Sequence, residues 1–281
     1  MLEAGAMQDL QKPAKPREKT GRHIGILDPV AAAEQFSLKR YLPSPPLEKL
    51  VLHHWIIRWN LVGKPPYRST VLPHPSINLA FLPGETRITG VTRGSYVYEI
   101  AGRGVIFGTM FRPGGFHPFY RRPVADLTDR AVPVSSVFPK ATDAFGEHIR
   151  SLADEAMVAE GEALLTETLG DPDPDALLAD TVVNAIATEP GLSTTAAVAC
   201  RFNRSERTLQ LLFQTYVGVG VKWVIMRYRM LEAAERAARD MRPNWTHIAH
   251  ELGYADQAHF SNAFRALVGQ SPTRYARSIK R

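Results

Sequence analysis

Residues 245–275 constrain the fold of this chain more than any other stretch, because their pattern predicts two short helices around a tight turn. The first helix carries three apolar residues at helical spacing, namely Ile248, Ala249 and Leu252. Gly253, which accepts positive φ, ends it, and Asp256 is placed to cap the next helix. The second helix has its own apolar stripe of Phe260, Ala263, Phe264 and Leu267. Two short helices joined in this way form a helix-turn-helix.

The same pattern occurs earlier in the chain. Three pairs of residues show it at an offset of 51 positions: Ser205 and Asp256, Leu209 and Phe260, and Phe213 and Phe264. Between the copies, residues 221–239 contain no Pro or Gly and predict one helix, about 28 Å long at ~1.5 Å per residue. Such a helix would hold the two motifs near the ~34 Å repeat of B-DNA, so that both enter successive major grooves.

The second helix of each motif is a candidate recognition helix. In the later motif, the residues off the apolar stripe are Gln257, Ala258, His259, Ser261, Asn262 and Arg265. In the earlier motif, the corresponding candidates are Arg204, Ser205, Arg207 and Gln210. Short polar and basic side chains suit base edges and phosphates. We therefore predict a DNA-binding surface here; the alternative is that these faces are only solvated.

Residues from about 192 to 277 resemble the DNA-binding domain of the AraC/XylS transcription regulators. The resemblance is carried by S-E-R-T-L-Q-L-L-F-Q-T-Y-V-G, by R-Y-R-M-L-E-A-A, and by I-A-H-E-L-G-Y-A-D-Q-A-H-F-S-N-A-F-R with G-Q-S-P-T-R-Y. It implies a sequence-specific regulator of transcription, either an activator or a repressor; an activator would also contact RNA polymerase. Two residues depart from the family pattern: Leu211 and Asn262 stand where basic residues are common.

Composition sets limits on the class of protein. A length of 281 residues suggests two domains, and 44% apolar with 22% charged residues is typical of a globular chain. No apolar run approaches the roughly 18 residues of a membrane span, and the first twenty residues are too charged for a signal peptide. We expect a cytoplasmic protein without a membrane partner. The single cysteine, Cys200, excludes an internal disulfide, and its place on a predicted helix favours a buried thiol.

Residues 24–138 predict a mostly antiparallel β domain, either barrel-like or a strongly bent sheet, which makes the whole chain α+β. Alternating residues mark a strand over 51–59, and further short strands are predicted between glycine-rich turns over 77–82, 87–92, 96–101 and 105–111. The segments L-P-H-P-S-I-N-L-A-F and G-T-M-F-R-P-G-G-F resemble, more loosely, a sensor-like domain that precedes some AraC-type domains. Residues 1–23 predict a disordered tail.

Residues 139–175 return to a helical period and are acidic, and we predict a helical linker or a dimerisation segment there. The Pro-rich stretch that ends this segment marks the predicted boundary, so that the all-α DNA-binding domain occupies residues 176–281. A homodimer through the linker helices is one interpretation of this segment.

The N-terminal domain offers a candidate site for a small-molecule effector. The candidate residues are Trp55, His74, Arg112, Gly114 and Gly115. Arg112 and the exposed amides of the glycine pair would suit an anion, although Arg112 would equally suit an ion pair with Asp126 or Asp129. The aromatic residues of the strands would line a pocket or simply form core. Four histidines, His53, His54, His74 and His117, lack a recognised metal-ligand spacing, so we predict no metal and no cofactor.

Sequence signatures of common enzymes are missing: there is no G-x-x-x-x-G-K-[ST], G-x-S-x-G, H-E-x-x-H or C-x-x-C. We predict a non-enzymatic regulator whose partner is double-stranded DNA. The rival hypothesis is a DNA-binding module fused to a β-domain enzyme such as a DNA-repair alkyl transferase. That chemistry needs a reactive cysteine, and Cys200 lies in the other domain.

Overall fold

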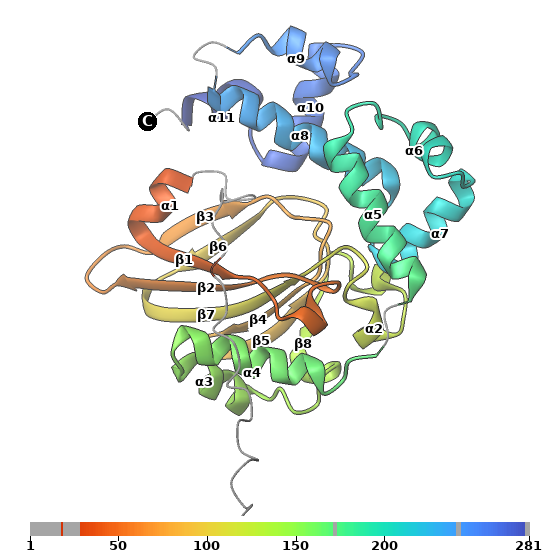
Figure 1. The fold of residues 1–281 in the computed structure, drawn as a ribbon. Helices are drawn as coiled ribbons and strands as arrows, with labels where there is room; N and C mark the ends of the chain where they lie inside the picture. The colour runs from red at the N-terminus through yellow and green to blue at the C-terminus, as the bar shows by residue number, and fades with distance from the viewer. Residues whose placement is uncertain (1–17, 19–28, 171–172, 240–242, 279–281) are drawn as a thin grey trace, which may run out of the picture.

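The computed structural model describes Glu18 and residues 29–170, 173–239 and 243–278. An antiparallel β domain with helices packed on it is followed by an all-helical domain (Figure 1). The predicted fold class is therefore confirmed. The tail predicted over residues 1–23 lies outside the described residues except for Glu18, which forms an isolated bridge with Tyr41.

The strands of the N-terminal domain form two sheets. Their bounds are β1 Phe36–Tyr41, β2 Val51–Leu61, β3 Tyr67–Val71, β4 Asn78–Leu82, β5 Glu85–Thr89, β6 Tyr96–Ile100, β7 Gly102–Phe111 and β8 Ala131–Pro133. The larger sheet has the order β1-β2-β7-β4-β5-β8, and β3 pairs with β6 in a second sheet. Strands β1 and β8 are the edges of the larger sheet, so this sheet does not close on itself. Strands β1, β3 and β8 were not predicted.

The two sheets face each other across an aromatic cluster. Trp55 and Trp59 of β2 lie opposite Gly108 and Gly104 of β7 in the strand register. A Cβ at either glycine would fall within 2.3 Å of the neighbouring indole ring, so both indoles lie flat on glycine backbone. The cluster is completed by apolar residues from both sheets, among them Leu61, Leu82, Ile100 and Ile106.

The opposite face of the larger sheet is covered by α3 (Asp143–Ser151) and α4 (Asp154–Thr166) (Figure 1). Gly161 of α4 lies so close to Phe107 that a Cβ would come within 2.5 Å of the ring. The carboxylate of Asp154 accepts a hydrogen bond from Arg58 Nη2 over 2.6 Å and thereby joins α4 to β2. Residues 143–166 thus complete the core of the N-terminal domain, and a linker or dimer role for them stays a prediction.

Short helical segments connect the elements of the N-terminal domain: α1 Pro29–Gln35, η1 Pro45–Leu47, α2 His117–Tyr120, η2 Val124–Leu127 and η3 Val134–Ser136. The C-terminal domain comprises α5 Pro174–Thr188, α6 Thr195–Arg201, α7 Glu206–Tyr216, α8 Val221–Arg239, α9 Trp245–Glu251, α10 Gln257–Val268 and α11 Pro272–Ser278. The long helix α8 has the bounds that the sequence predicts. Over the described ranges, no single helix has the length and apolar character of a membrane span; α7 with residues 221–234 of α8 reaches them only as a pair bent by 75°.

The hydrophobic core is shared unequally between the two halves of the C-terminal domain. Helices α5 to α7 and the start of α8 belong to one continuous core with the N-terminal sheet. Helices α9 to α11 and the later part of α8 form a separate core, to which the N-terminal domain contributes Leu72. The first helix-turn-helix is therefore anchored on the N-terminal domain, and the second packs mainly on itself.

Candidate DNA-binding surface

Helices α6 and α7 form the first helix-turn-helix. Thr194 caps α6, and the hydroxyl of Ser205 caps α7 by accepting a hydrogen bond from the backbone N–H of Thr208 over 3.1 Å. Leu209 and Phe213 of α7 are fully buried, as their spacing predicts. Capping and burial together fix the direction in which the opposite face of α7 projects.

Helices α9 and α10 repeat this construction. Gly253 adopts φ +76° in the turn, and the carboxylate of Asp256 accepts a hydrogen bond from the backbone N–H of His259 over 2.7 Å. Phe260 and Phe264 are fully buried, and Gly269 ends α10 at φ +82°. The caps, turn glycine and core positions predicted for this motif are all confirmed.

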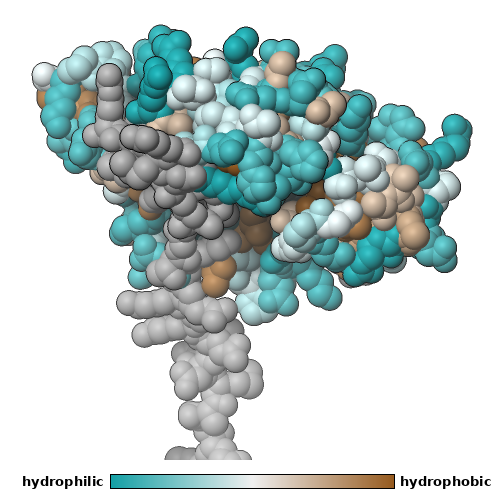
Figure 2. Space-filling model, turned by 90° about the horizontal axis from the view of Figure 1, so that it is seen from above, coloured by the Kyte–Doolittle hydropathy of each residue, from teal (hydrophilic) through white to brown (hydrophobic). Residues whose placement is uncertain are grey.

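The predicted DNA-binding residues lie on the surfaces of these two units. Nine of the ten are exposed, and Ser261 is half-buried. Arg207 and Arg265 form no ion pair with any other described residue, so both guanidinium groups are available to a phosphate or a base. Ser205, in contrast, already uses its hydroxyl as the cap of α7. Viewed from the side of the C-terminal domain, the molecular surface is mostly hydrophilic (Figure 2).

One contact at this surface was not predicted. Thr246, in the first turn of α9, donates a hydrogen bond from Oγ1 to Oε1 of Gln257 over 2.7 Å. The contact holds the Oε1 side of the Gln257 amide and does not use its Nε2 donors. The sequence signal was weak, because the two residues lie eleven positions apart on different helices.

Comparison with known proteins agrees with this geometry. Residues 198–278, from α6 to α11, match a family described as a helix-turn-helix domain. The transcriptional activator RhaS of Escherichia fergusonii is 37% identical over 76 residues, which cover 27% of this chain and 27% of that protein. Residues 198–278 are therefore an AraC-type helix-turn-helix domain, similar to the DNA-binding domain of AraC/XylS transcription regulators. The chain thus matches only about a quarter of the length of the curated relative (27%).

A second curated relative and two solved structures also match. The probable transcriptional regulator LumQ of Photobacterium leiognathi is 36% identical over 64 residues, covering 23% of this chain and 25% of that one. Among solved structures, the C-terminal domain of AraT from Geobacillus stearothermophilus superposes with TM-score 0.34 at 27% identity, over 39% of this chain and 88% of that one. ToxT from Vibrio cholerae gives TM-score 0.37 at 9% identity, over 88% and 98%.

The N-terminal region matches a second family, described as a domain of unknown function (DUF6597), over residues 39–133. The match runs from β1 to β8 and includes both segments on which the sensor-like resemblance rests. The chain therefore combines this β domain with an AraC-type helix-turn-helix domain.

Four of the five candidate effector residues lie where the two domains meet. The N–H of Gly114 donates to the carbonyl oxygen of Tyr216 over 3.1 Å, and that of Gly115 donates to the carbonyl of Arg112 over 2.8 Å. Both amides are engaged, so the exposed anion-binding donors predicted here are not present in this arrangement. The guanidinium of Arg112 contacts neither Asp126 nor Asp129; it lies 3.5 Å from Asp180 of α5.

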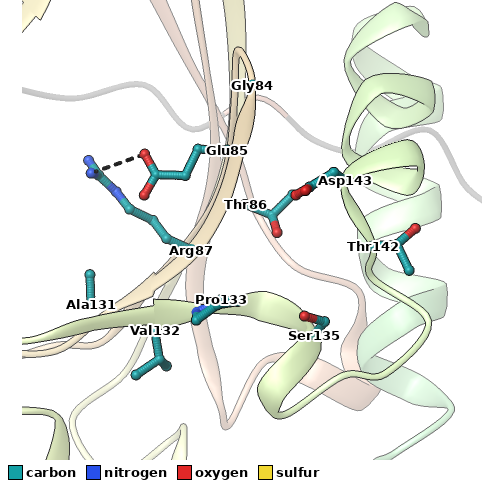
Figure 3. Close-up of a pocket in the computed structure, with 10 residues that line it drawn as sticks. All are labelled: Gly84, Glu85, Thr86, Arg87, Ala131, Val132, Pro133, Ser135, Thr142 and Asp143. Carbon is teal, nitrogen blue, oxygen red and sulfur yellow. Dashed lines mark ion pairs between the residues drawn. The ribbon is translucent and has the colours of Figure 1, made fainter.

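His74 belongs to the same junction, and Trp55 does not. The ring of His74 meets the ring of Tyr228 of α8 edge-on at 6.0 Å. Trp55 lies in the cluster between the sheets. The structure thus does not gather the five residues around one cavity, and none of them lines the groove of about 480 Å³ beside β5, β8 and α3 shown in Figure 3.

The junction also contains a charged residue that the sequence did not single out. Arg227 of α8 is fully buried, and its Nε donates to the carbonyl oxygen of Pro73. Neither Nη1 nor Nη2 has a hydrogen-bond partner among the described residues. Burial lowers the pKa of the Arg227 guanidinium to about 10, so the group remains charged at neutral pH. Arginine is rarely fully buried in proteins, so no pattern in the sequence indicated that Arg227 lies in the core.

Two other expectations can be compared with the structure. Cys200 was expected to be buried and is exposed, because the buried face of α6 consists of Val198 and Ala199 and the next residue points away from it. His54 is buried between Thr109 Oγ1, at 2.9 Å from Nδ1, and Glu162 Oε1, at 3.2 Å from Nε2. Within the described ranges, no three His, Cys, Asp or Glu residues form a group that could hold a metal ion.

Proposed function

We propose that this regulator binds a DNA site of two half-sites, with α7 in one major groove and α10 in the next. The observation that carries the proposal is the pair of capped helix-turn-helix units on α8, each with an exposed polar recognition face. At ~1.5 Å per residue, the 19 residues of α8 span about 28 Å, close to one turn of B-DNA. One chain would then contact the two grooves that simpler helix-turn-helix proteins contact as dimers.

Selection of operators from a random duplex pool, followed by hydroxyl-radical footprinting with the full-length protein, tests this proposal. We expect two protected segments about 10–10.5 bp apart on one side of the duplex. Arg207→Ala and Gln210→Ala should relax base preference in one segment, and Gln257→Ala and His259→Ala in the other, at about 1–3 kcal/mol for each lost base contact. Protection of a single groove segment would contradict the second docked unit.

We also propose that the N-terminal domain controls DNA binding in response to a small-molecule effector. The junction supports this, because Gly114, Thr128 and Arg93 make hydrogen bonds to Tyr216, Gly218 and Trp223, at the end of α7 and the start of α8. A ligand that binds one arrangement of this junction more tightly than another would change how the two recognition helices are presented. Contact with RNA polymerase and homodimer formation are further proposals for the whole protein.

A thermal-shift screen of the full-length protein against metabolites, followed by operator titration with each stabilising compound, tests the control proposal. We expect at least one compound to change operator affinity or oligomeric state. If every stabilising compound leaves affinity, oligomeric state and transcription unchanged, the N-terminal domain is structural and the proposal is wrong.

A further inference from the structure

Leu211 is an apolar side chain exposed in the middle of a polar recognition face. Leu211 is 64% exposed. The other exposed large apolar residues in the described ranges all lie in the N-terminal domain, namely Val62, Tyr96 and Val97. A lone exposed leucine needs no explanation by itself. Its position on a recognition helix is what makes it informative.

The face of α7 that carries Leu211 is well defined. Arg207, Gln210, Leu211 and Gln214 are all exposed and follow the spacing of one helical face. The opposite face, with Leu209, Leu212, Phe213 and Tyr216, is buried. The N-terminal domain contacts the C-terminal end of α7, where Gly114 reaches Tyr216, and leaves this face uncovered.

The internal duplication places the same position on the second recognition helix. The offset of 51 residues that relates Ser205 to Asp256 relates Leu211 to Asn262, which is also exposed. The two recognition helices therefore present an apolar group and an amide at equivalent places. An amide makes directional hydrogen bonds to base edges, whereas a leucine can make none.

Only one group on the base edges of the major groove is apolar, and it is the C5-methyl of thymine. We propose that Leu211 packs against this methyl, so that the half-site bound by α7 requires a thymine at one position. The inference rests on the proposed function, because it needs α7 in the major groove. It also makes the two half-sites chemically different: the α10 half-site meets Asn262 at the equivalent position and has no such requirement.

Replacement of thymine by deoxyuridine tests the contact, because it removes the methyl group and leaves every hydrogen-bonding atom in place. In the selected operator, each thymine of the α7 half-site is replaced singly, and affinity is measured for the full-length protein and for Leu211→Ala. We expect one replacement to weaken wild-type binding about three- to fivefold, the effect of exposing one buried methyl. The same replacement should leave the operator affinity of Leu211→Ala unchanged. A 5-methylcytosine paired with guanine restores the methyl but changes the neighbouring polar groups, so it should recover only part of the lost wild-type affinity.

Val62→Ala is the matched control, since Val62 is also an exposed apolar residue but lies in the N-terminal domain. It should respond to every deoxyuridine as the wild type does. Thymines in the α10 half-site should affect wild type and Leu211→Ala equally.

The outcomes separate this inference from the proposed function. If specific sites with two half-sites are selected but no deoxyuridine distinguishes wild type from Leu211→Ala, the methyl contact is wrong and two-groove binding stands. If Leu211→Ala binds the operator normally and loses only transcription, Leu211 contacts a protein instead of DNA. If no specific site is selected, both the inference and the proposed function fail.

Discussion

The backbone N–H of Gly114 donates to the carbonyl oxygen of Tyr216 over 3.1 Å, and this hydrogen bond ties the glycine pair of the N-terminal domain to the last residue of α7. The close approach depends on glycine. Gly114 adopts φ +80°, and a Cβ there would lie 2.4 Å from the carbonyl oxygen of Ala176 in α5. The stretch that the sequence offered as an anion site is therefore the place where the two domains come into backbone contact.

Gly114→Ala should loosen the junction. The added methyl meets backbone that cannot move aside, in addition to the strain of positive φ, so we expect a loss of about 2–4 kcal/mol in the free energy of unfolding. Gly84→Ala is the matched control, because Gly84 has φ +73° and nothing within 4 Å of the added Cβ. It should lose only about 1 kcal/mol. Thermal unfolding measures the loss of stability in both variants. Faster hydrogen exchange in α5 and α7 should occur in Gly114→Ala alone. Equal losses in the two variants would show that the steric contact is unimportant.

Arg227→Met should stabilise the protein or leave its stability unchanged. The substitution removes a buried charge whose Nη atoms have no partner among the described residues, together with the Nε hydrogen bond to Pro73. Replacing buried charged groups by apolar side chains is often neutral or stabilising by about 1–4 kcal/mol. Arg229→Met is the comparison, since Arg229 Nη2 donates to the carbonyl oxygen of Ser193 over 2.5 Å. That variant should lose about 1 kcal/mol. A larger loss for Arg227→Met than for Arg229→Met, measured by denaturant unfolding, would show that the Nη atoms of Arg227 are paired in solution.

Glu162→Gln should lower the free energy of unfolding at neutral pH. It should also make that free energy depend less on pH in the acidic range. Burial acts to raise the pKa of Glu162, but hydrogen bonds from His54 and from the backbone N–H of Ser44 outweigh it and hold the pKa below its usual value. A lowered carboxyl pKa stabilises the fold above the unfolded pKa of about 4.3, and this stabilisation disappears as pH falls through the folded pKa. We expect a loss of about 1–2 kcal/mol at pH 7 and a smaller slope of unfolding free energy between about pH 5 and 3.

The control for this variant is Glu167→Gln, which breaks the exposed ion pair with Lys140. It should change stability by less than about 1 kcal/mol. A pH profile of Glu162→Gln parallel to that of the wild type would show that the carboxylate does not contribute through its ionisation.

Thr246→Val should change which base the second recognition helix prefers. Without the hydroxyl that holds Oε1, the amide of Gln257 is free to turn so that Oε1 accepts and Nε2 donates to one base, which is the pairing that suits adenine. We expect the preference at that base pair to shift toward adenine by about 1 kcal/mol, with Thr246→Ser behaving as the wild type. Operator selection with the wild type, Thr246→Val and Thr246→Ser measures the shift. Identical base preferences in all three would show that Thr246 does not influence base recognition.

The parts that were predicted well depend on local sequence. Ser205 and Asp256 cap their helices, Gly253 takes positive φ, and α8 begins and ends where its uninterrupted pattern does. Strands were predicted where apolar residues alternate, as in β2, and missed where polar residues predominate, as in β3. A short polar strand is specified by its partner strand, here β6, and not by its own residues.

The sequence by itself determined the two capped helix-turn-helix units and the helix between them, because caps, turn glycines and apolar spacing act over a few residues. It also determined which side chains form the exposed polar faces of α7 and α10, since each face is opposite an apolar stripe. Only the tertiary structure decided how the domains meet. Arg112 reaches Asp180, Gly114 reaches Tyr216 and Arg227 reaches Pro73 across 68, 102 and 154 positions. Such contacts depend on the packing of whole domains, which no local pattern of residues encodes.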